Sequence, residues 1–156
     1  MPLAYVAIGS NLGDREQTLL DAVEALRAEP GVEVVAVSSL IETDPVGFLD
    51  QPRFVNGVVA LETTLPARAL LELLLAVERR FGRRREGVPA QGPRTLDLDL
   101  LLYGDLVVDE PGLTVPHPLL TQRLFVLEPL ADLAPELKIP GNGTVQALLA
   151  ELQSPP

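Results

Sequence analysis

The chain has 156 residues, a formal net charge of −10 at pH 7 and a hydrophobic content of 47%. This length is expected to form one domain, 1–156, with a full core, and the charge argues against general affinity for nucleic acid or anionic membranes. The absence of cysteine excludes disulfides, thiolate chemistry and cysteine-based zinc sites. Because no apolar run approaches the roughly 20 residues of a membrane span, and the N-terminus has no basic signal region, we expect a cytoplasmic protein.

Periodicity in the first half of the chain predicts strands and one helix. The apolar positions indicate, in chain order, a strand over 3–8, a helix over 14–28, a strand over 32–41 and a strand over 54–61. A turn is expected over 9–13; a strand-to-helix connection is a more common role for it than a phosphate cradle. The segment 43–52 is predicted to be a loop. Because no helix separates the second and third strands, they are expected to be antiparallel neighbours.

A second helix is expected to have Thr64 as its N-cap, Pro66 in its first turn and Gly82 just past its end. A loop over 83–92 follows. Arginines gather here: six of the 12 Lys and Arg residues fall within 79–94. An acidic chain that collects half of its cationic side chains in one stretch is expected to bind a polyanion there.

Two aspartates stand among the leucines of the next strand. Leucines at every second position are expected to share one face: Leu96, Leu98, Leu100 and Leu102. Asp97 and Asp99 then project from the opposite face, with Cα atoms roughly 6.5–7 Å apart. Paired carboxylates suit Mg²⁺, which binds one or two of them together with phosphate oxygens, and Arg94 can grip a phosphate. An amphipathic strand facing water is the alternative, and the nearby arginines argue against it.

The remainder of the chain completes the predicted fold. A turn at 104–105 and a short strand over 106–108 are expected to close a hairpin on the Asp-containing strand. The segment 119–130 is predicted to be mostly helical, and Thr144 to cap a last short helix. The order β-α-β-β-α-β predicts an α+β, ferredoxin-like core with an added β-hairpin and C-terminal helices. This fold hosts many functions and does not decide between them.

Several motifs together resemble the hydroxymethyldihydropterin pyrophosphokinase family of folate biosynthesis. The strongest is Gly-Pro-Arg-Thr-Leu-Asp-Leu-Asp-Leu at 92–100, and it is joined by Ala-Ile-Gly-Ser-Asn-Leu-Gly at 7–13 and Leu-Thr-Val-Pro-His-Pro at 113–118. The resemblance covers nearly the whole chain in the order of the family. It implies transfer of the β,γ-pyrophosphoryl group of ATP to the hydroxymethyl oxygen of a reduced pterin, with release of AMP.

The resemblance also implies roles for particular residues. Asp97 and Asp99 would hold two Mg²⁺ ions and, with Arg83 and Arg94, form the catalytic set. The implied ATP-binding residues are Glu78, Arg83, Arg85, Arg94, Leu100, Thr114, His117 and Arg123. The implied pterin-binding residues are Thr43, Asp44, Val46, Phe54, Asn56 and Phe125. Phe54 and Phe125 would sandwich the ring, and Asn56 would read its donor and acceptor edge.

The chain departs from the family pattern at several positions. Gln91 stands where members often have a tryptophan, and the segment 85–92 is one residue longer than in a familiar bacterial member. Leu75 and Gly112 occupy positions of polar nucleotide contacts. We expect the segment 85–92 and the one around Phe48 to close over ATP before the pterin is committed to reaction.

Three other readings compete with this enzyme. A ferredoxin-like small-molecule-binding module without catalysis would release no AMP. An RNA-binding domain of similar topology would need a basic surface and exposed aromatic residues, whereas this chain is only 4% aromatic. A kinase of the same fold that makes ADP would be recognised by its product. The expected partners are ATP and the reduced pterin, with no nucleic acid and no membrane, and the protein is expected to be a monomer.

Overall fold

The computed structural model describes residues 2–11, 13–44, 53–82 and 96–153. An antiparallel sheet forms its centre, in the strand order β2–β4–β1–β5, with β3 paired to one end of β4. The strands span β1 Leu3–Ser10, β2 Val32–Val37, β3 Ile41–Thr43, β4 Phe54–Thr63 and β5 Asp97–Tyr103. Some predictions concern residues outside the described ranges: Val46, Phe48, Arg83, Arg85, Gln91, Arg94 and the loop over 83–92.

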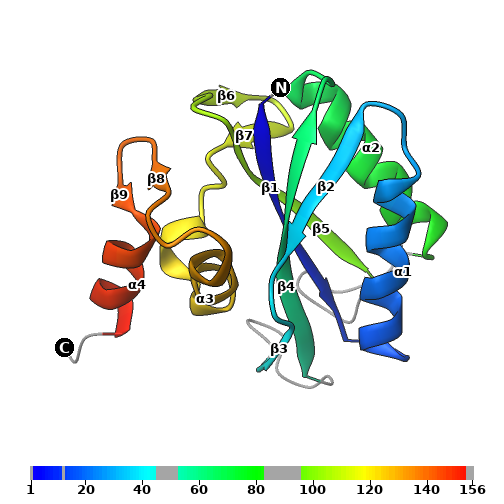
Figure 1. Ribbon diagram of the computed structural model, residues 1–156, viewed down its shortest axis with the longest axis horizontal. Helices are drawn as coiled ribbons and strands as arrows, with labels where there is room; N and C mark the ends of the chain where they lie inside the picture. The colour runs from blue at the N-terminus through cyan, green and yellow to red at the C-terminus, as the bar shows by residue number, and fades with distance from the viewer. Residues whose placement is uncertain (1, 12, 45–52, 83–95, 154–156) are drawn as a thin grey trace.

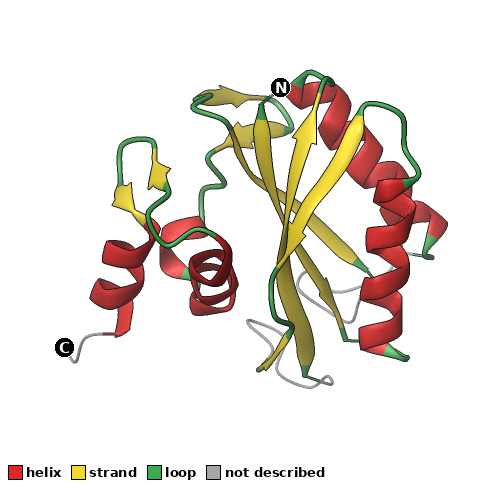
Figure 2. Ribbon diagram, in the orientation of Figure 1, coloured by secondary structure: helices red, strands yellow, loops and turns green. Residues whose placement is uncertain are grey.

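Helices cover both faces of this sheet. Helices α1 (Arg15–Arg27) and α2 (Ala67–Arg80) lie on one face, and α3 (Leu124–Leu133) lies on the other, with α4 (Val145–Gln153) packed outside α3 (Figure 1). Figure 2 shows the same separation of helical and strand layers. The predicted α+β, ferredoxin-like fold class is confirmed. No helix in the described part of the chain is long and apolar enough to cross a membrane.

The sheet therefore has an apolar core on each side. On the α1/α2 side, the stripe of Leu70, Leu74 and Val77 on α2 is fully buried against the leucines of β5. On the α3 side, a second cluster includes Leu101, Leu127 and Leu130 together with apolar residues of α4. Each fully buried leucine contributes about 1.5–3 kcal/mol of transfer free energy. Both faces of β1 and β5 are consequently fixed in position, and both strands contribute to the pocket described below.

The predicted strand over 32–41 is in fact two strands separated at Ser38. The Ser38 N–H donates to the carbonyl of Val58, while the Ser38 hydroxyl oxygen accepts the Val58 N–H at 2.8 Å. Next to it, the Ser39 N–H donates to the carboxylate of Asp132 on α3. Side chains thus replace the ladder hydrogen bonds at the interruption, which periodicity alone does not reveal. β1 also continues through Ser10, so the predicted turn over 9–13 begins too early.

The prediction of Thr64 as a helix N-cap is wrong. Helix α2 begins at Ala67 with Pro66 at the N-cap, and Pro66 has an extended backbone there. The residue before a proline is disfavoured in the α conformation, so Leu65 could not serve as the first helical residue after Thr64. Gly82 does lie just past the end of the helix with φ +82°, as predicted.

A β-bulge in β5 changes which leucines share a face. The pairing with β1 shifts between Tyr5 and Val6, whose partners are Leu102 and Leu100. Leu101 is the extra residue, and the alternation restarts beyond it. Leu96, Leu98 and Leu100 face the α1/α2 core as predicted, but Leu102 packs in the core on the α3 side. The prediction of one leucine face through position 102 is therefore wrong at its last member.

The added hairpin is present but is built from other strands. Strand β6 (Val108–Glu110) pairs with β7 (Leu113–Val115), not with β5, so the predicted strand over 106–108 is misplaced. Gly112 adopts φ +78° and makes the turn between the two strands. A further small hairpin joins β8 (Lys138–Ile139) to β9 (Gly143–Thr144).

The predicted helix over 119–130 is divided at Arg123. A 3₁₀ turn over Leu120–Gln122 precedes α3, and Arg123 between them is extended, with φ −120° and ψ 110°. Farther along, the Ala147 N–H donates to the Thr144 hydroxyl at 3.1 Å, which confirms Thr144 as the cap of α4.

Candidate active site

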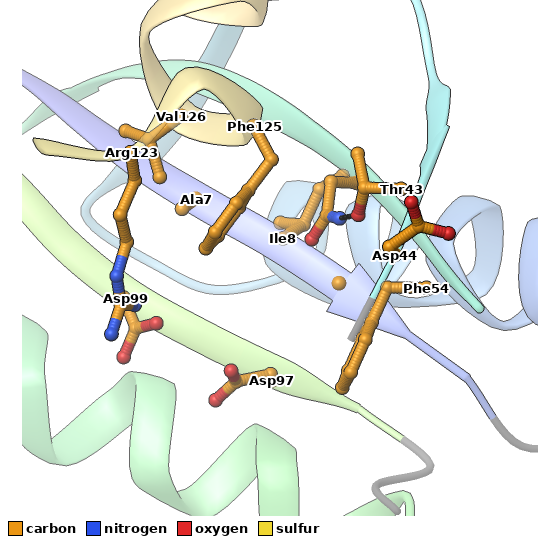
Figure 3. A pocket seen from close by; sticks show the side chains of 12 residues that line it. Ala7, Ile8, Thr43, Asp44, Phe54, Asp97, Asp99, Arg123, Phe125 and Val126 are labelled. Carbon is orange, nitrogen blue, oxygen red and sulfur yellow. Dashed lines mark hydrogen bonds between the residues drawn. The ribbon is translucent and has the colours of Figure 1, made fainter. Parts of the chain in front are cut away.

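An open pocket of about 560 Å³ lies between the sheet and α3, toward the end of β1 and the start of β5. This figure includes the part of the space that is open to solvent. Figure 3 shows side chains from β3, β5 and α3 pointing into it. The lining residues lie on β1, β3, β4, β5 and α3, or directly next to β3 or α3. They are Ala7, Ile8, Gly9, Thr43, Asp44, Phe54, Asn56, Asp97, Asp99, Arg123, Phe125 and Val126.

Asp97 and Asp99 reach the pocket because β5 alternates. The leucines on either side of them are buried in the opposite core, so both carboxylates project to the pocket face and stay partly exposed. Across the strand pair, Asp97 faces Gly9 and Asp99 faces Ala7. These small partners on β1 leave space above the sheet next to both carboxylates. The shared face predicted for the two aspartates is present.

Arg123 and Phe125 enter the pocket from the start of α3. The extended backbone of Arg123 lies at the helix N-cap. Its guanidinium carbon lies 5.3 Å from the centre of the Phe125 ring, a cation–π arrangement that holds both planar groups in place. The pocket thus has one cationic side chain among its described lining residues, on the wall beside the two aspartates.

A buried amide forms another part of the wall. Asn56 is 9% exposed, and its Nδ2 donates to the hydroxyl oxygen of Thr43. Phe54, two residues earlier on β4, is the register partner of Thr43 on β3. Phe54, Thr43 and Asn56 therefore form one continuous surface made by two paired strands, with an aromatic ring at one end and an oriented amide at the other.

His117 lies near this pocket but is not among its lining residues. Its Nδ1 accepts the N–H of Leu119 at 3.1 Å, which assigns the ring proton of the neutral form to Nε2. Burial lowers the pKa of His117, and the positive charge of Arg123 lowers it further, while Asp97 acts in the opposite direction. His117 is consequently a neutral donor at pH 7.

Three other predicted ATP contacts lie outside the pocket. Glu78 on α2 is 2% exposed, and its Oε2 accepts the N–H of Leu98 at 2.7 Å. The side chain of Leu100 packs in the opposite core and does not reach the pocket. Thr114 is exposed on β7, where its hydroxyl lies 3.4 Å from a carboxylate oxygen of Asp109.

The pocket also contains residues that were not predicted to belong to it. Ala7, Ile8, Gly9 and Val126 line it. Their signal in the sequence was small size or ordinary hydrophobicity, which does not distinguish a pocket wall from a core. Only the family-like motif at 7–13, which contains Ala7 and Gly9, indicated that this part of β1 could belong to a functional site.

Residues 5–135 match the sequence model of the family described as 7,8-dihydro-6-hydroxymethylpterin-pyrophosphokinase. The chain belongs to this family. The family match spans every residue that lines the pocket. Membership of the pyrophosphokinase family therefore covers the candidate site as well as the fold.

Curated members of the family are similar to the chain over most of their length. A 2-amino-4-hydroxy-6-hydroxymethyldihydropteridine pyrophosphokinase of Pseudomonas aeruginosa is 49% identical over 146 residues, which cover 94% of this chain and 89% of the relative. The protein of the same name from Bacillus subtilis is 46% identical over 136 residues, which cover 87% of this chain and 80% of the relative.

Solved structures of family members share the fold. The chain aligns with a crystal structure of Plasmodium falciparum HPPK-DHPS with pteroate at a TM-score of 0.71 and 14% identity, covering 96% of this chain. It spans 42% of that longer chain. At 14% identity this likeness shows only that the two proteins share a fold. The family assignment rests on the family model and the sequence relatives.

Proposed function

We propose that the pocket between β5 and α3 is where this pyrophosphokinase carries out its reaction. The enzyme transfers pyrophosphate from ATP to 6-hydroxymethyl-7,8-dihydropterin, in folate biosynthesis. The products are AMP and the pterin diphosphate. The location is supported by one observation above all: Asp97 and Asp99 share a pocket with an oriented amide and two aromatic rings.

The two aspartates fit a magnesium site. Both carboxylates are partly exposed on the pocket side of one strand. The described residues contain no group of three or more His, Cys, Asp or Glu side chains that could enclose a metal. Magnesium commonly binds one or two carboxylates and takes its other ligands from substrate phosphates and water. We therefore assign Asp97 and Asp99 as ligands of two Mg²⁺ ions, which when bound would neutralise phosphate charge and lower the pKa of the attacking hydroxyl.

The protein itself supplies position and charge. Arg123 offers a fixed guanidinium to the triphosphate, because its cation–π contact with Phe125 limits its freedom. His117 adds a neutral Nε2–H donor that can bind a phosphate oxygen without taking its proton. Arg83, Arg85 and Arg94 belong to the same proposal through the family resemblance. In-line attack of the pterin hydroxyl on the β-phosphorus then depends mainly on alignment.

The pterin half of the pocket is proposed to contain Phe54, Phe125 and Asn56. Flat heterocycles stack on aromatic rings, and Phe54 and Phe125 both line the pocket. Asn56 offers a carbonyl acceptor and an N–H donor side by side, which suits the donor and acceptor edge of a pterin. The side chain of Thr43 and the backbone of Asp44 lie next to it.

Identification of the nucleotide product tests this proposal. Protein is mixed with ATP, MgCl₂ and 6-hydroxymethyl-7,8-dihydropterin, and the products are separated by anion-exchange chromatography. We expect AMP and a pterin diphosphate in equal amounts. A folded protein that binds the pterin and releases no nucleotide would instead support the small-molecule-binding module, and ADP would indicate a different phosphoryl transfer. The monomeric state and the cytoplasmic location stay predictions.

A further inference from the structure

Gly9 lies between the two halves of the pocket. On β1 it is the register partner of Asn56 on β4 and of Asp97 on β5. A Cβ atom added to Gly9 would lie 2.7 Å from the Asn56 Oδ1 and 3.7 Å from the Asn56 Cγ. The shorter distance is a severe overlap for a carbon and an oxygen that are not bonded to each other. Gly9 lies within a regular strand, so space, rather than backbone conformation, is what excludes a side chain there.

The overlap matters because the Asn56 carboxamide is held from its other end. Its Nδ2 donates to Thr43 on β3, and the residue is nearly buried. One of the two Nδ2 hydrogens is donated to Thr43, and Oδ1 is turned to the side of Gly9. The amide is therefore held between β3 and β1, with the hydroxyl of Thr43 fixing its orientation and the bare backbone of Gly9 providing its space.

We infer that Gly9 is a positioning residue of the pterin subsite, because its missing side chain gives the Asn56 carboxamide the space to keep one orientation. This inference rests on the proposed function for the identity of the ligand. A carboxamide in one orientation presents its acceptor and donor in a fixed order, and it pairs only with a ligand edge of complementary order. A side chain at position 9 would tilt the amide and break this match.

Gly57 on β4, the residue after Asn56, offers a matched control on the other face of the sheet. A Cβ on Gly57 would lie 2.8 Å from Leu40 Cδ2 and 3.2 Å from the Ser38 hydroxyl oxygen. Its crowding is thus similar in degree to that at Gly9, but the two short contacts involve Leu40 and Ser38, which do not line the pocket, and the Ile8 Cγ1 lies at an ordinary contact distance of 3.6 Å. Gly57 is also the register partner of Ile8, the residue next to Gly9. A general effect of crowding the sheet would appear in Gly57→Ala as well.

The experiment compares Gly9→Ala and Gly57→Ala in the full chain. Steady-state AMP release gives KM for the pterin and for ATP separately, and thermal unfolding gives the loss of stability. We expect Gly9→Ala to raise the pterin KM by about tenfold or more, with a change in the ATP KM of less than about twofold. Gly57→Ala is expected to lower Tm without this selective rise. Equal pterin KM values in wild type and folded Gly9→Ala would overturn the inference, and so would a rise of the same size in Gly57→Ala.

A second readout does not depend on activity. The side-chain amide of Asn56 gives a pair of proton–nitrogen NMR signals, which are assigned by their loss in Asn56→Ser. We expect these signals to shift in Gly9→Ala and to stay in place in Gly57→Ala. Unchanged Asn56 signals in Gly9→Ala would overturn the inference even if the wild type proved inactive. An inactive wild type with shifted signals would count against the proposed function alone.

A double variant covers the case in which Gly9→Ala does not fold. Serine at position 56 ends at the atom that replaces Cγ, and the Cγ position is a normal 3.7 Å from the added Cβ. If the carboxamide is what fills the space, Gly9→Ala combined with Asn56→Ser should be more stable than Gly9→Ala alone. A double variant no more stable than Gly9→Ala would contradict the inference.

Discussion

Glu78 on α2 accepts a 2.7 Å hydrogen bond from the backbone N–H of Leu98, the residue between Asp97 and Asp99. Leu98 lies on β5, at one end of the strand order, and this carboxylate ties β5 to α2 at that point. The bond is almost completely shielded from solvent, since Glu78 is 2% exposed. The spacing of the two aspartates is thus held by a buried side chain that is not among the pocket-lining residues.

Loss of this bond should reduce stability. Glu78→Ala leaves the Leu98 N–H unsatisfied in a buried position, which costs about 1–3 kcal/mol. Glu78→Gln should lose less, because an amide oxygen can still accept the bond. Urea unfolding of both variants measures the difference, with the exposed Glu72→Ala on the same helix as the control. Equal stability of Glu78→Ala and Glu72→Ala would show that the bond contributes nothing.

Asp97 and Asp99 should be needed for metal-dependent nucleotide binding. Asp97→Asn and Asp99→Asn keep the size of each side chain and remove the charge that attracts Mg²⁺. With a non-hydrolysable ATP analogue, MgCl₂ should raise the Tm of the wild type and raise that of either variant much less, because ligand bound to the native state stabilises it. Asp105→Asn, in the exposed turn after β5, is the control. If MgCl₂ and the analogue raised the Tm of both variants as much as that of the wild type, the two aspartates would not be metal ligands.

The pKa of His117 should lie below its usual value. His117 is the single histidine of the chain, so its ring proton signal can be followed by NMR without ambiguity. Because burial and Arg123 lower the pKa of His117, the unfolded chain takes up the proton at a higher pH than the folded one. The stabilisation that comes from keeping His117 neutral in the folded protein is therefore fully present above pH 6.5. It is lost as the pH falls through the lowered pKa of His117 in the folded state. A titration midpoint at or above 6.5 in the folded protein would contradict this.

Two substitutions should move the His117 pKa in opposite directions. Arg123→Gln removes a positive charge that lowers the pKa of His117, so the titration midpoint should rise. Asp97→Asn removes a negative charge that raises the pKa of His117, so the midpoint should fall. The same NMR titration measures both, and Asp105→Asn is again the control. Shifts of the same sign in the two variants would show that His117 does not sense these two charges separately.

Much of the fold was predictable because its signals are local. Gly82 ends a helix through its left-handed conformation and Thr144 caps one through its hydroxyl, and each acts on neighbours within a few residues. The alternation in β5 similarly placed Asp97 and Asp99 on one face. The predictions failed where distant residues decide the structure. The bulge at Leu101 is visible only in the pairing with β1, and the break at Ser38 depends on hydrogen bonds to Val58.

The pocket itself was predictable only in part. Family-like motifs indicated Phe54, Asn56 and Phe125, although periodicity alone would assign these residues to ordinary strands and a helix. The role inferred for Gly9 could not be predicted, because it arises from the distance between side-chain and backbone atoms on neighbouring strands. The extended backbone of Arg123 was also missed, since the surrounding sequence is typical of a continuous helix.

AMP formation by wild type, Asp97→Asn and Asp99→Asn tests the central claim most directly, with Asp105→Asn as the matched control. The rates are measured with ATP, MgCl₂ and the hydroxymethyl pterin, and circular dichroism verifies that each variant is folded. We predict rapid AMP formation by wild type and Asp105→Asn, and a loss of about a thousandfold or more in each of the other two. If folded Asp97→Asn and Asp99→Asn both kept more than about a tenth of the wild-type rate, the reaction would not depend on these carboxylates and the assigned site would be wrong.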